Sequence, residues 1–303
     1  MKIQIFTTAI ISILLTACML LTSCGWLVTT GESGPVTTRE YEFTDFNSLD
    51  VGSAFKVDIS HSDTYSVQII ANESVYKNVN VNQSGNTLKI GLRWPGFFFN
   101  IHNYNLKAII TMPELSKLTL SGATKGTVSG FQSSNDCEVR LSGASDLEID
   151  METGKFDSSI SGSSEMTAHI KSSDTKIELS GSSDMKLDIT TGSFVYRSSG
   201  ASEATGIVQA TSTGIHLSGS SEIRFTGSGG DLVLSASGAS DCKLVGYYIE
   251  DADVELSGAS QADMDINGEL NVSLSGASGL KYGGNPVLGH RMDISGGASM
   301  ERR

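Results

Sequence analysis

Residues 161–179 read SGSSEMTAHIKSSDTKIEL, and the next 19 residues, 180–198, read SGSSDMKLDITTGSFVYRS. The opening motif is serine, glycine, a small residue, and serine or threonine. It occurs ten times, with successive copies 18 to 21 residues apart, the last in the altered form SGGAS. A fixed repeat this short indicates a solenoid, in which each repeat packs against its neighbours. The first serines of the copies are Ser121, Ser142, Ser161, Ser180, Ser199, Ser218, Ser237, Ser257, Ser275 and Ser295.

The residues after each motif alternate between apolar and polar side chains. A period of two is that of a β-strand, whose successive side chains point to opposite faces. A second alternating stretch, such as Ile177 and Leu179, closes each repeat, so each repeat is predicted to hold two short strands. The two columns predicted to face inward are Leu147, Met166, Met185, Ala204, Ile223, Cys242, Ala262 and Leu280, and Ile149, Ala168, Leu187, Gly206, Phe225, Leu244, Met264 and Tyr282.

These repeats are too short for other repeat folds. A propeller blade needs ~40 residues, and no repeat has the spacing of leucine-rich repeats. We therefore predict an all-β fold, a right-handed single-stranded parallel β-helix with about 19 residues per coil. It covers residues 36–303, with less regular coils over 36–120 and regular coils over 121–303. The motif glycine is predicted at a tight corner that requires a positive φ or excludes a Cβ.

The composition agrees with a folded, acidic protein. Hydrophobic residues make up 39% of the chain, enough for a core. Lys and Arg number 21 against 34 Asp and Glu, which gives a net charge of −13. A nucleic-acid partner is excluded, because the chain lacks the basic footprint that phosphate binding requires.

The N-terminus resembles a bacterial export signal, with Lys2 followed by a mostly apolar stretch to Ser23. A permanent transmembrane helix is the alternative, since the apolar run approaches the ~20 residues that span a bilayer. The sequence LTSC, ending at Cys24, resembles the lipobox of bacterial lipoproteins, and LTAC, ending at Cys18, fits the same pattern. Cleavage at Cys18 would leave the apolar residues 19–21 exposed on the mature protein. We therefore prefer Cys24.

This choice predicts a signal peptide over residues 1–23, a tether over 24–35, and a membrane anchor through lipid on Cys24. The expected location is the outer membrane, on its periplasmic face or at the cell surface. The absence of acidic residues directly after Cys24 favours the periplasmic side.

Two cysteines, Cys137 and Cys242, lie in the body of the chain about five predicted coils apart. At ~4.8 Å per coil their separation is roughly 24 Å, whereas a disulfide requires Cα atoms within ~7 Å. They are predicted to be free thiols.

Four segments carry a family resemblance: residues 48–59 (SLDVGSAFKVDI), 88–92 (LKIGL), 111–115 (TMPEL) and 118–124 (LTLSGAT). With the later motif copies, they resemble the auto-transporter adhesin "head GIN" domain family of largely Bacteroidetes exported proteins and lipoproteins. The resemblance implies a right-handed parallel β-helix and supplies no catalytic motif.

Six acidic residues stand one place before the first inward column of successive repeats. Stacked at ~4.8 Å they could bind cations such as Ca²⁺. The alternative, which we favour, is a solvated acidic ridge, because no calcium-binding loop motif accompanies them. The ridge consists of Asp146, Glu165, Asp184, Glu203, Glu222 and Asp241.

A second outward column places His169 between Asp150 and Asp188. This arrangement could hold a metal loosely, although charge pairing along the strands is the interpretation we favour. No other histidines have ligand spacing, and we expect neither a cofactor nor catalytic residues.

Residues 94–104 (WPGFFFNIHNY) interrupt the pattern with five aromatic residues. They could form a loop that grips a partner, because aromatics dominate binding hot spots. The alternative, which we favour, is that they cover an end or side of the apolar interior, since solenoids require such caps. The candidate binding or capping residues are Trp94, Phe97, Phe98, Phe99 and Tyr104.

These features favour a non-enzymatic cell-envelope lipoprotein that presents β-helix surfaces to a glycan or protein partner. One alternative is a carbohydrate-active β-helix enzyme, although such enzymes need a groove with convergent carboxylates and the repeats leave almost no protruding loops. The other alternative is a periplasmic scaffold that forms homo-oligomers.

Overall fold

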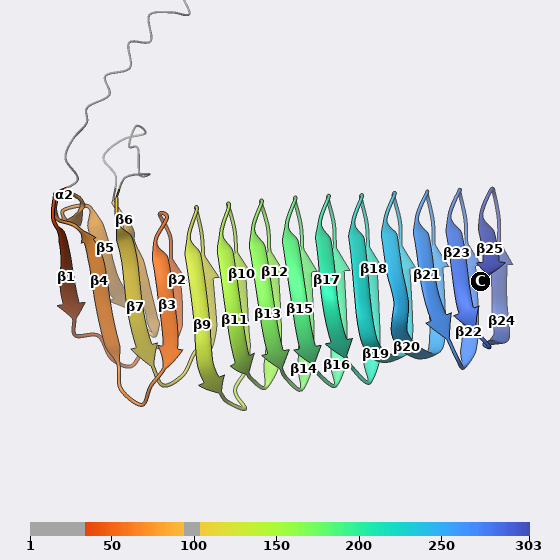
Figure 1. The fold of residues 1–303 in the computed structure, drawn as a ribbon, viewed down its shortest axis with the longest axis horizontal. Helices are drawn as coiled ribbons and strands as arrows, with labels where there is room; N and C mark the ends of the chain where they lie inside the picture. Colours follow the sequence, from red (N-terminus) through yellow and green to blue (C-terminus); the bar gives the residue numbers. More distant parts are fainter. Residues whose placement is uncertain (1–33, 94–103) are drawn as a thin grey trace, which may run out of the picture. The chain divides into compact units, whose positions relative to one another are not determined.

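The computed structural model describes residues 34–93 and 104–303. All of its strands lie in the compact unit Pro35–Arg303, which is a parallel β-solenoid of about 10 turns with roughly 19 residues per coil (Figure 1). The predicted fold class is confirmed. The described hydrophobic core also lies entirely within this unit, which is therefore expected to fold on its own.

Each regular coil contributes one strand to each of two parallel-stranded layers, which we call sheet 1 and sheet 2. In spatial order, sheet 1 consists of β1 (Val36–Tyr41), β4 (Ser66–Asn72), β7 (Leu106–Met112), β3 (Lys56–His61), β9 (Lys125–Gln132), β11 (Asp146–Glu152), β13 (Glu165–Lys171), β15 (Asp184–Thr190), β17 (Glu203–Gln209), β19 (Glu222–Ala236), β20 (Asp241–Leu256), β21 (Gln261–Ile266), β23 (Gly279–Gly284) and β25 (Ser299–Arg302).

Sheet 2 consists, in the same direction, of β5 (Val79–Ser84), β6 (Thr87–Leu92), β2 (Ser48–Val51), β8 (Lys117–Leu120), β10 (Cys137–Leu141), β12 (Lys155–Ile160), β14 (Asp174–Leu179), β16 (Ser193–Ser198), β18 (Ser212–Leu217), the second halves of β19 and β20, β22 (Glu269–Leu274) and β24 (Val287–Ile294). The long strands β19 and β20 turn the corner between the sheets without a break, and so belong to both.

The predicted inward columns form the core between the two sheets. Nearly all of their residues are buried, from Leu147 on β11 to Leu280 on β23. Two members, Gly206 and Tyr282, are only partly buried. Within the core, the rings of Phe194, Tyr196 and Phe225 contact one another, with centroids 5.5 to 6.3 Å apart.

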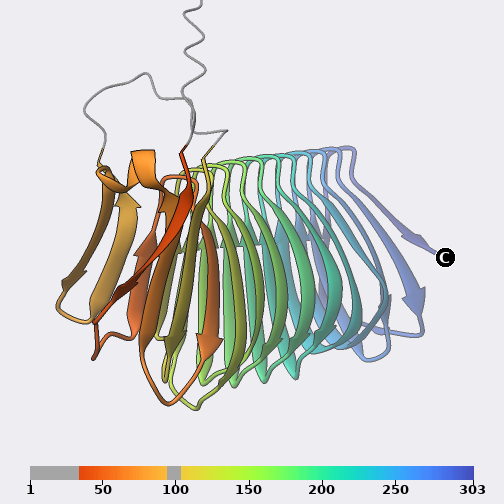
Figure 2. The same ribbon diagram turned by 60° about the vertical axis from the view of Figure 1, so that its left-hand side comes forward.

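The Ser-Gly motifs form the corners along one edge of the solenoid, where they stack coil upon coil (Figure 2). At a representative corner Gly181 has φ +77°, and a Cβ on it would lie 2.5 Å from the carbonyl oxygen of Gly162 in the preceding coil. The N–H of Ser182 donates to that same oxygen at 2.8 Å. Glycine is thus required twice, for its backbone conformation and for the close approach of the next coil.

The fourth residue of the motif is buried inside the corner. Ser183 is fully buried, and its hydroxyl donates to the carbonyl oxygen of Ser180 at 2.9 Å. The same bond recurs in the motif copies from Thr124 to Ser278. A small hydroxyl side chain therefore fills the corner and satisfies its own donor.

The N-terminal coils depart from this regular stacking. The coil of β2 and β3 lies between the coil of β6 and β7 and the coil of β8 and β9, although both follow it in sequence. The strands β1, β4 and β7 pair antiparallel, as do β5 and β6. A single helical turn, α2 (Glu73–Tyr76), buries Val75 and Tyr76 over the core. The N-terminal end is thus closed by antiparallel strands, an arrangement that the repeat pattern did not predict.

No helix among the described residues is long and apolar enough to span a membrane.

Candidate functional site

The predicted lipidation site Cys24 and the aromatic residues Trp94 and Phe97 to Phe99 lie outside the described residues. Tyr104 is described, and it is partly buried against the core just before β7. The segment 94–104 connects β6 to β7, the connection that a glycine corner makes in the regular coils. The choice between a binding loop and a cap therefore stays a prediction.

The predicted acidic ridge is aligned along the outer face of sheet 1. Each of its residues is the register partner of the next on neighbouring parallel strands. The register runs through Asp146, Glu165, Asp184, Glu203, Glu222 and Asp241. The aligned ridge is the most extended set of equivalent charged groups on the outer face of this sheet.

Basic side chains neutralise both ends of the ridge. Lys125 lies 2.9 Å from Asp146, and Lys243 lies 2.7 Å from both Glu222 and Asp241. The hydrogen bond from Lys243 holds the pKa of the Glu222 carboxyl below its usual value. Sequence reasoning missed these pairs: Lys125 occupies the ridge position of the first repeat, four residues after Ser121, and Lys243 stands two residues beyond the ridge position of its repeat.

The middle of the ridge is less neutralised. Lys186 approaches Glu165 at 3.4 Å, but no ion pair within the described residues involves Asp184 or Glu203. Both of these carboxylates are exposed to solvent. The centre of sheet 1 therefore presents negative charge that is open to an external partner.

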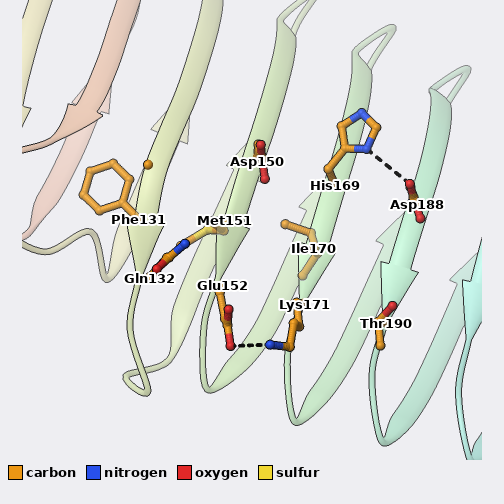
Figure 3. Close-up of a pocket in the computed structure, with 11 residues that line it drawn as sticks. Phe131, Gln132, Asp150, Met151, Glu152, His169, Ile170, Lys171, Asp188 and Thr190 are labelled. Carbon is orange, nitrogen blue, oxygen red and sulfur yellow. Dashed lines mark hydrogen bonds and ion pairs between the residues drawn. The ribbon is translucent and has the colours of Figure 1, made fainter.

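The column of Asp150, His169 and Asp188 lies on the same face as the ridge, four residues further along each strand, and lines a shallow depression (Figure 3). His169 Nδ1 is 3.6 Å from an Asp188 carboxylate oxygen, and both side chains are more than half exposed. On the same face Lys171 forms an ion pair of 2.8 Å with Glu152.

This arrangement matches charge pairing between strands. Among residues 34–93 and 104–303, no group of three or more His, Cys, Asp and Glu side chains is placed to hold a metal ion.

Sheet 2 carries its own column of charged residues on its outer face. Glu178, Arg197 and His216 are register partners on β14, β16 and β18. Burial, reinforced by the positive charge of Arg197, lowers the pKa of His216. Lys176 pairs with Glu178 at 2.9 Å. Glu178, Arg197 and His216 line a shallow depression on this face, and no ion pair within the described residues joins the three.

Both cysteines in the body of the solenoid are free, as predicted, and both are buried. Burial raises the pKa of Cys137 to about 12, and it raises the pKa of Cys242 as well. Neither thiol is available as a nucleophile at neutral pH.

The stacked corners and two-strand coils define a parallel β-solenoid. The family model described as "Putative auto-transporter adhesin, head GIN domain" matches residues 45–189 and 175–286. The chain belongs to this family, as its sequence motifs suggested.

Solved structures from two Parabacteroides species share the fold. A putative lipid binding protein from Parabacteroides distasonis aligns with a TM-score of 0.54 at 17% identity, covering 89% of this chain and 97% of that chain. A putative adhesin from Parabacteroides merdae aligns with a TM-score of 0.52 at 13% identity, with the same coverages. No functionally curated protein matches the chain. The family indicates an adhesin-like protein of the exported or cell-envelope class.

Proposed function

We propose that the chain is a non-enzymatic cell-envelope lipoprotein that binds a glycan or protein partner on the outer face of sheet 1. The observation that carries this proposal is the aligned acidic ridge, whose central carboxylates Asp184 and Glu203 have no ion-pair partner within the described residues. Equivalent groups recur at the coil spacing of ~4.8 Å. Such an array engages a repetitive partner at many weak points at once, which raises its overall affinity.

The flat geometry supports binding over catalysis. Ion pairs on the outer faces run along or between strands, as with Lys186 and Glu165, and leave the charges spread over the sheet. An enzyme acting on polysaccharide would need convergent carboxylates in a groove.

The first test asks where the protein lies. Intact cells are treated with protease and probed by immunoblot for this protein and for a periplasmic control. Loss of the band with the control intact is expected of a surface adhesin. Protection would confine binding to periplasmic partners and contradict a role at the cell surface.

The second test asks whether the ridge binds. The unit 35–303 is screened against glycan arrays and immobilised envelope polysaccharides. The double variant Asp184→Asn/Glu203→Gln is expected to lose most of any binding found. The matched control, Asp174→Asn/Asp231→Asn, removes the same charge from exposed positions on sheet 2 that form no ion pair within the described residues. Equal loss in both variants would show a general charge effect and contradict the ridge as the site.

The third test concerns the anchor. Metabolic labelling with a fatty acid is expected to mark the wild type and the variant Cys18→Ala, and to fail in Cys24→Ala. Labelling that depends on Cys18 would move the mature N-terminus, and labelling of neither cysteine would contradict the lipoprotein assignment.

A further inference from the structure

The C-terminal end of the solenoid leaves inward-facing positions uncovered. Leu288 and Ile294 on β24 are register partners of Leu270 and Leu274 on β22. The two leucines of β22 are at most 1% exposed, whereas Leu288 is 51% exposed and Ile294 is 46% exposed. With Val287 at 70%, this strand carries three of the eight strongly exposed large apolar side chains of the described residues.

Both sheets also end here with a strand that is paired on one side. Within the described chain β24 pairs only with β22, and β25 pairs only with β23 (Figure 1). Unpaired strand edges and exposed apolar side chains each favour association with another chain. The two features coincide at one end of the molecule.

The opposite end is different. Its edge strands β1 and β5 expose one large apolar side chain, Val36, at 47%. The interior behind them is covered by Val75 and Tyr76 of α2, each at most 4% exposed. Among the described residues, this end therefore exposes less large apolar surface than β24 does.

We infer that the C-terminal end binds a second copy of this chain, end to end, about a two-fold axis that pairs β24 and β25 with strands of the other copy. A second copy related by a two-fold axis presents its own β24 and β25 edges, which are as far apart as those of the first copy. Each edge of the first copy can therefore pair with one edge of the second, and both sheets are extended across the interface. The pairing is antiparallel. The fold already accommodates antiparallel extension at its other end, where β4 pairs with β7 and β5 with β6.

The charges on β24 support this arrangement. Arg291 and Asp293 stand two residues apart, and antiparallel pairing centred on Met292 places each opposite the other residue of the second copy. Arg291 also bridges to Glu255 at 3.1 Å and to Asp253. Asp293 has no ion pair within the described residues, so the second copy supplies one. This interface does not depend on the proposed ligand of sheet 1.

Sedimentation velocity over a concentration series tests the inference on the unit 35–303. The wild type is expected to show a monomer and dimer in equilibrium, because one solenoid end is a small interface. Leu288→Asp is expected to abolish the dimer. Asp293→Lys is expected to weaken it by about tenfold or more, because it faces Arg291 of the second copy with a like charge.

Two control variants match the exposure of the tested positions. Val233→Asp alters a side chain 53% exposed on the outer face of β19, and Val36→Asp alters the other end. Both are expected to dimerise like the wild type, and unchanged thermal midpoints show that all variants fold. A wild type that is monomeric throughout, a dimer that survives Leu288→Asp, or a dimer lost in Val36→Asp would overturn the inference. So would growth into longer filaments, which indicates head-to-tail stacking.

Discussion

The regular coils, 121–303, and the N-terminal coils, 36–120, share the two-strand coil but are held together differently. In the regular coils the same few contacts recur at every level, at the glycine corner and the buried serine behind it. In the N-terminal coils each contact occurs once. Examples are the antiparallel pairing of β1 with β4 and the hydrogen bond from the Tyr76 hydroxyl to the carbonyl oxygen of Thr37. Because the contacts repeat, the structure of the regular coils can be predicted from the repeat pattern. The contacts of the N-terminal coils do not repeat, so the same pattern does not predict them.

The largest expected effect on the free energy of unfolding comes from replacing a glycine that packs against the preceding coil, compared with one that does not. Gly181 and Gly85 both have positive φ, but a Cβ on Gly181 would strike the preceding coil, whereas nothing lies within 4 Å of one on Gly85. Gly181→Ala is expected to cost roughly 3–5 kcal/mol, since strain and steric overlap add, and Gly85→Ala roughly 1–2 kcal/mol. Urea unfolding of both variants measures the difference. Equal costs would show that coil stacking does not impose the glycine.

The next effect concerns the closed N-terminal end. The Tyr76 hydroxyl lies 3.0 Å from the carbonyl oxygen of Thr37 and also hydrogen-bonds Ile69, which links β1 and β4. Tyr76→Phe is expected to lower stability by about 1–2 kcal/mol. Tyr65→Phe is the control, because no hydrogen bond within the described residues involves its hydroxyl. Thermal melts that rank the two variants alike would refute a specific role for Tyr76.

A smaller effect is expected inside one regular coil. Ser183→Ala removes the corner hydrogen bond and is expected to cost about 1 kcal/mol. Ser158 is equally buried, but no hydrogen bond within the described residues involves its hydroxyl, so Ser158→Ala is expected to be neutral or slightly stabilising. The sign of the difference in unfolding midpoint distinguishes the two. A destabilised Ser158→Ala would mean that its hydroxyl is bonded in solution.

The smallest effect is expected from the outer charges. Hydrogen bonds from Lys117 and Lys243 hold the pKa values of Glu138 and Glu222 below the ordinary glutamate value. A carboxyl with a lowered folded-state pKa stabilises the fold above its unfolded pKa, and this stability is lost as pH falls through the folded value. The four side chains are half-buried, between 34% and 41% exposed, and with solvent screening each pair is expected to contribute less than about 1 kcal/mol. Acid titration of urea midpoints should be shallower for Glu222→Gln, and high salt should reduce the difference.

The sequence predicts the two-strand coil and its inward columns. Apolar residues alternate with a period of two inside a repeat of about 19 residues, and a parallel β-helix is the fold that accommodates both the alternation and the repeat length. The burial of Ser183 escaped prediction, because a serine beside a glycine corner does not reveal that its hydroxyl turns inward to Ser180. The position of β2 and β3 also escaped, because their partners β6 and β7 lie far along the chain and repeat no motif.

The candidate site was predictable in part for the same reason. Alignment of the acidic ridge follows from equal coil lengths, so its register could be read from the sequence. Neutralisation by Lys243 depends on which way a long side chain turns from a neighbouring column, and spacing alone does not specify this.

The position of β2 and β3 between coils that follow them in sequence limits the order in which the strands can pair during folding. A chain made from its N-terminus delivers residues 56–61 long before their two neighbours, β7 and β9, which end at residue 132. The strands of the first coil therefore have unpaired edges on both sides until these neighbours are made. Each regular coil, in contrast, follows a coil with which it can pair as soon as it is made. We therefore expect the coil of β2 and β3 to complete its pairing only after residue 132 has been made, which leaves this early segment open to misassembly during biosynthesis.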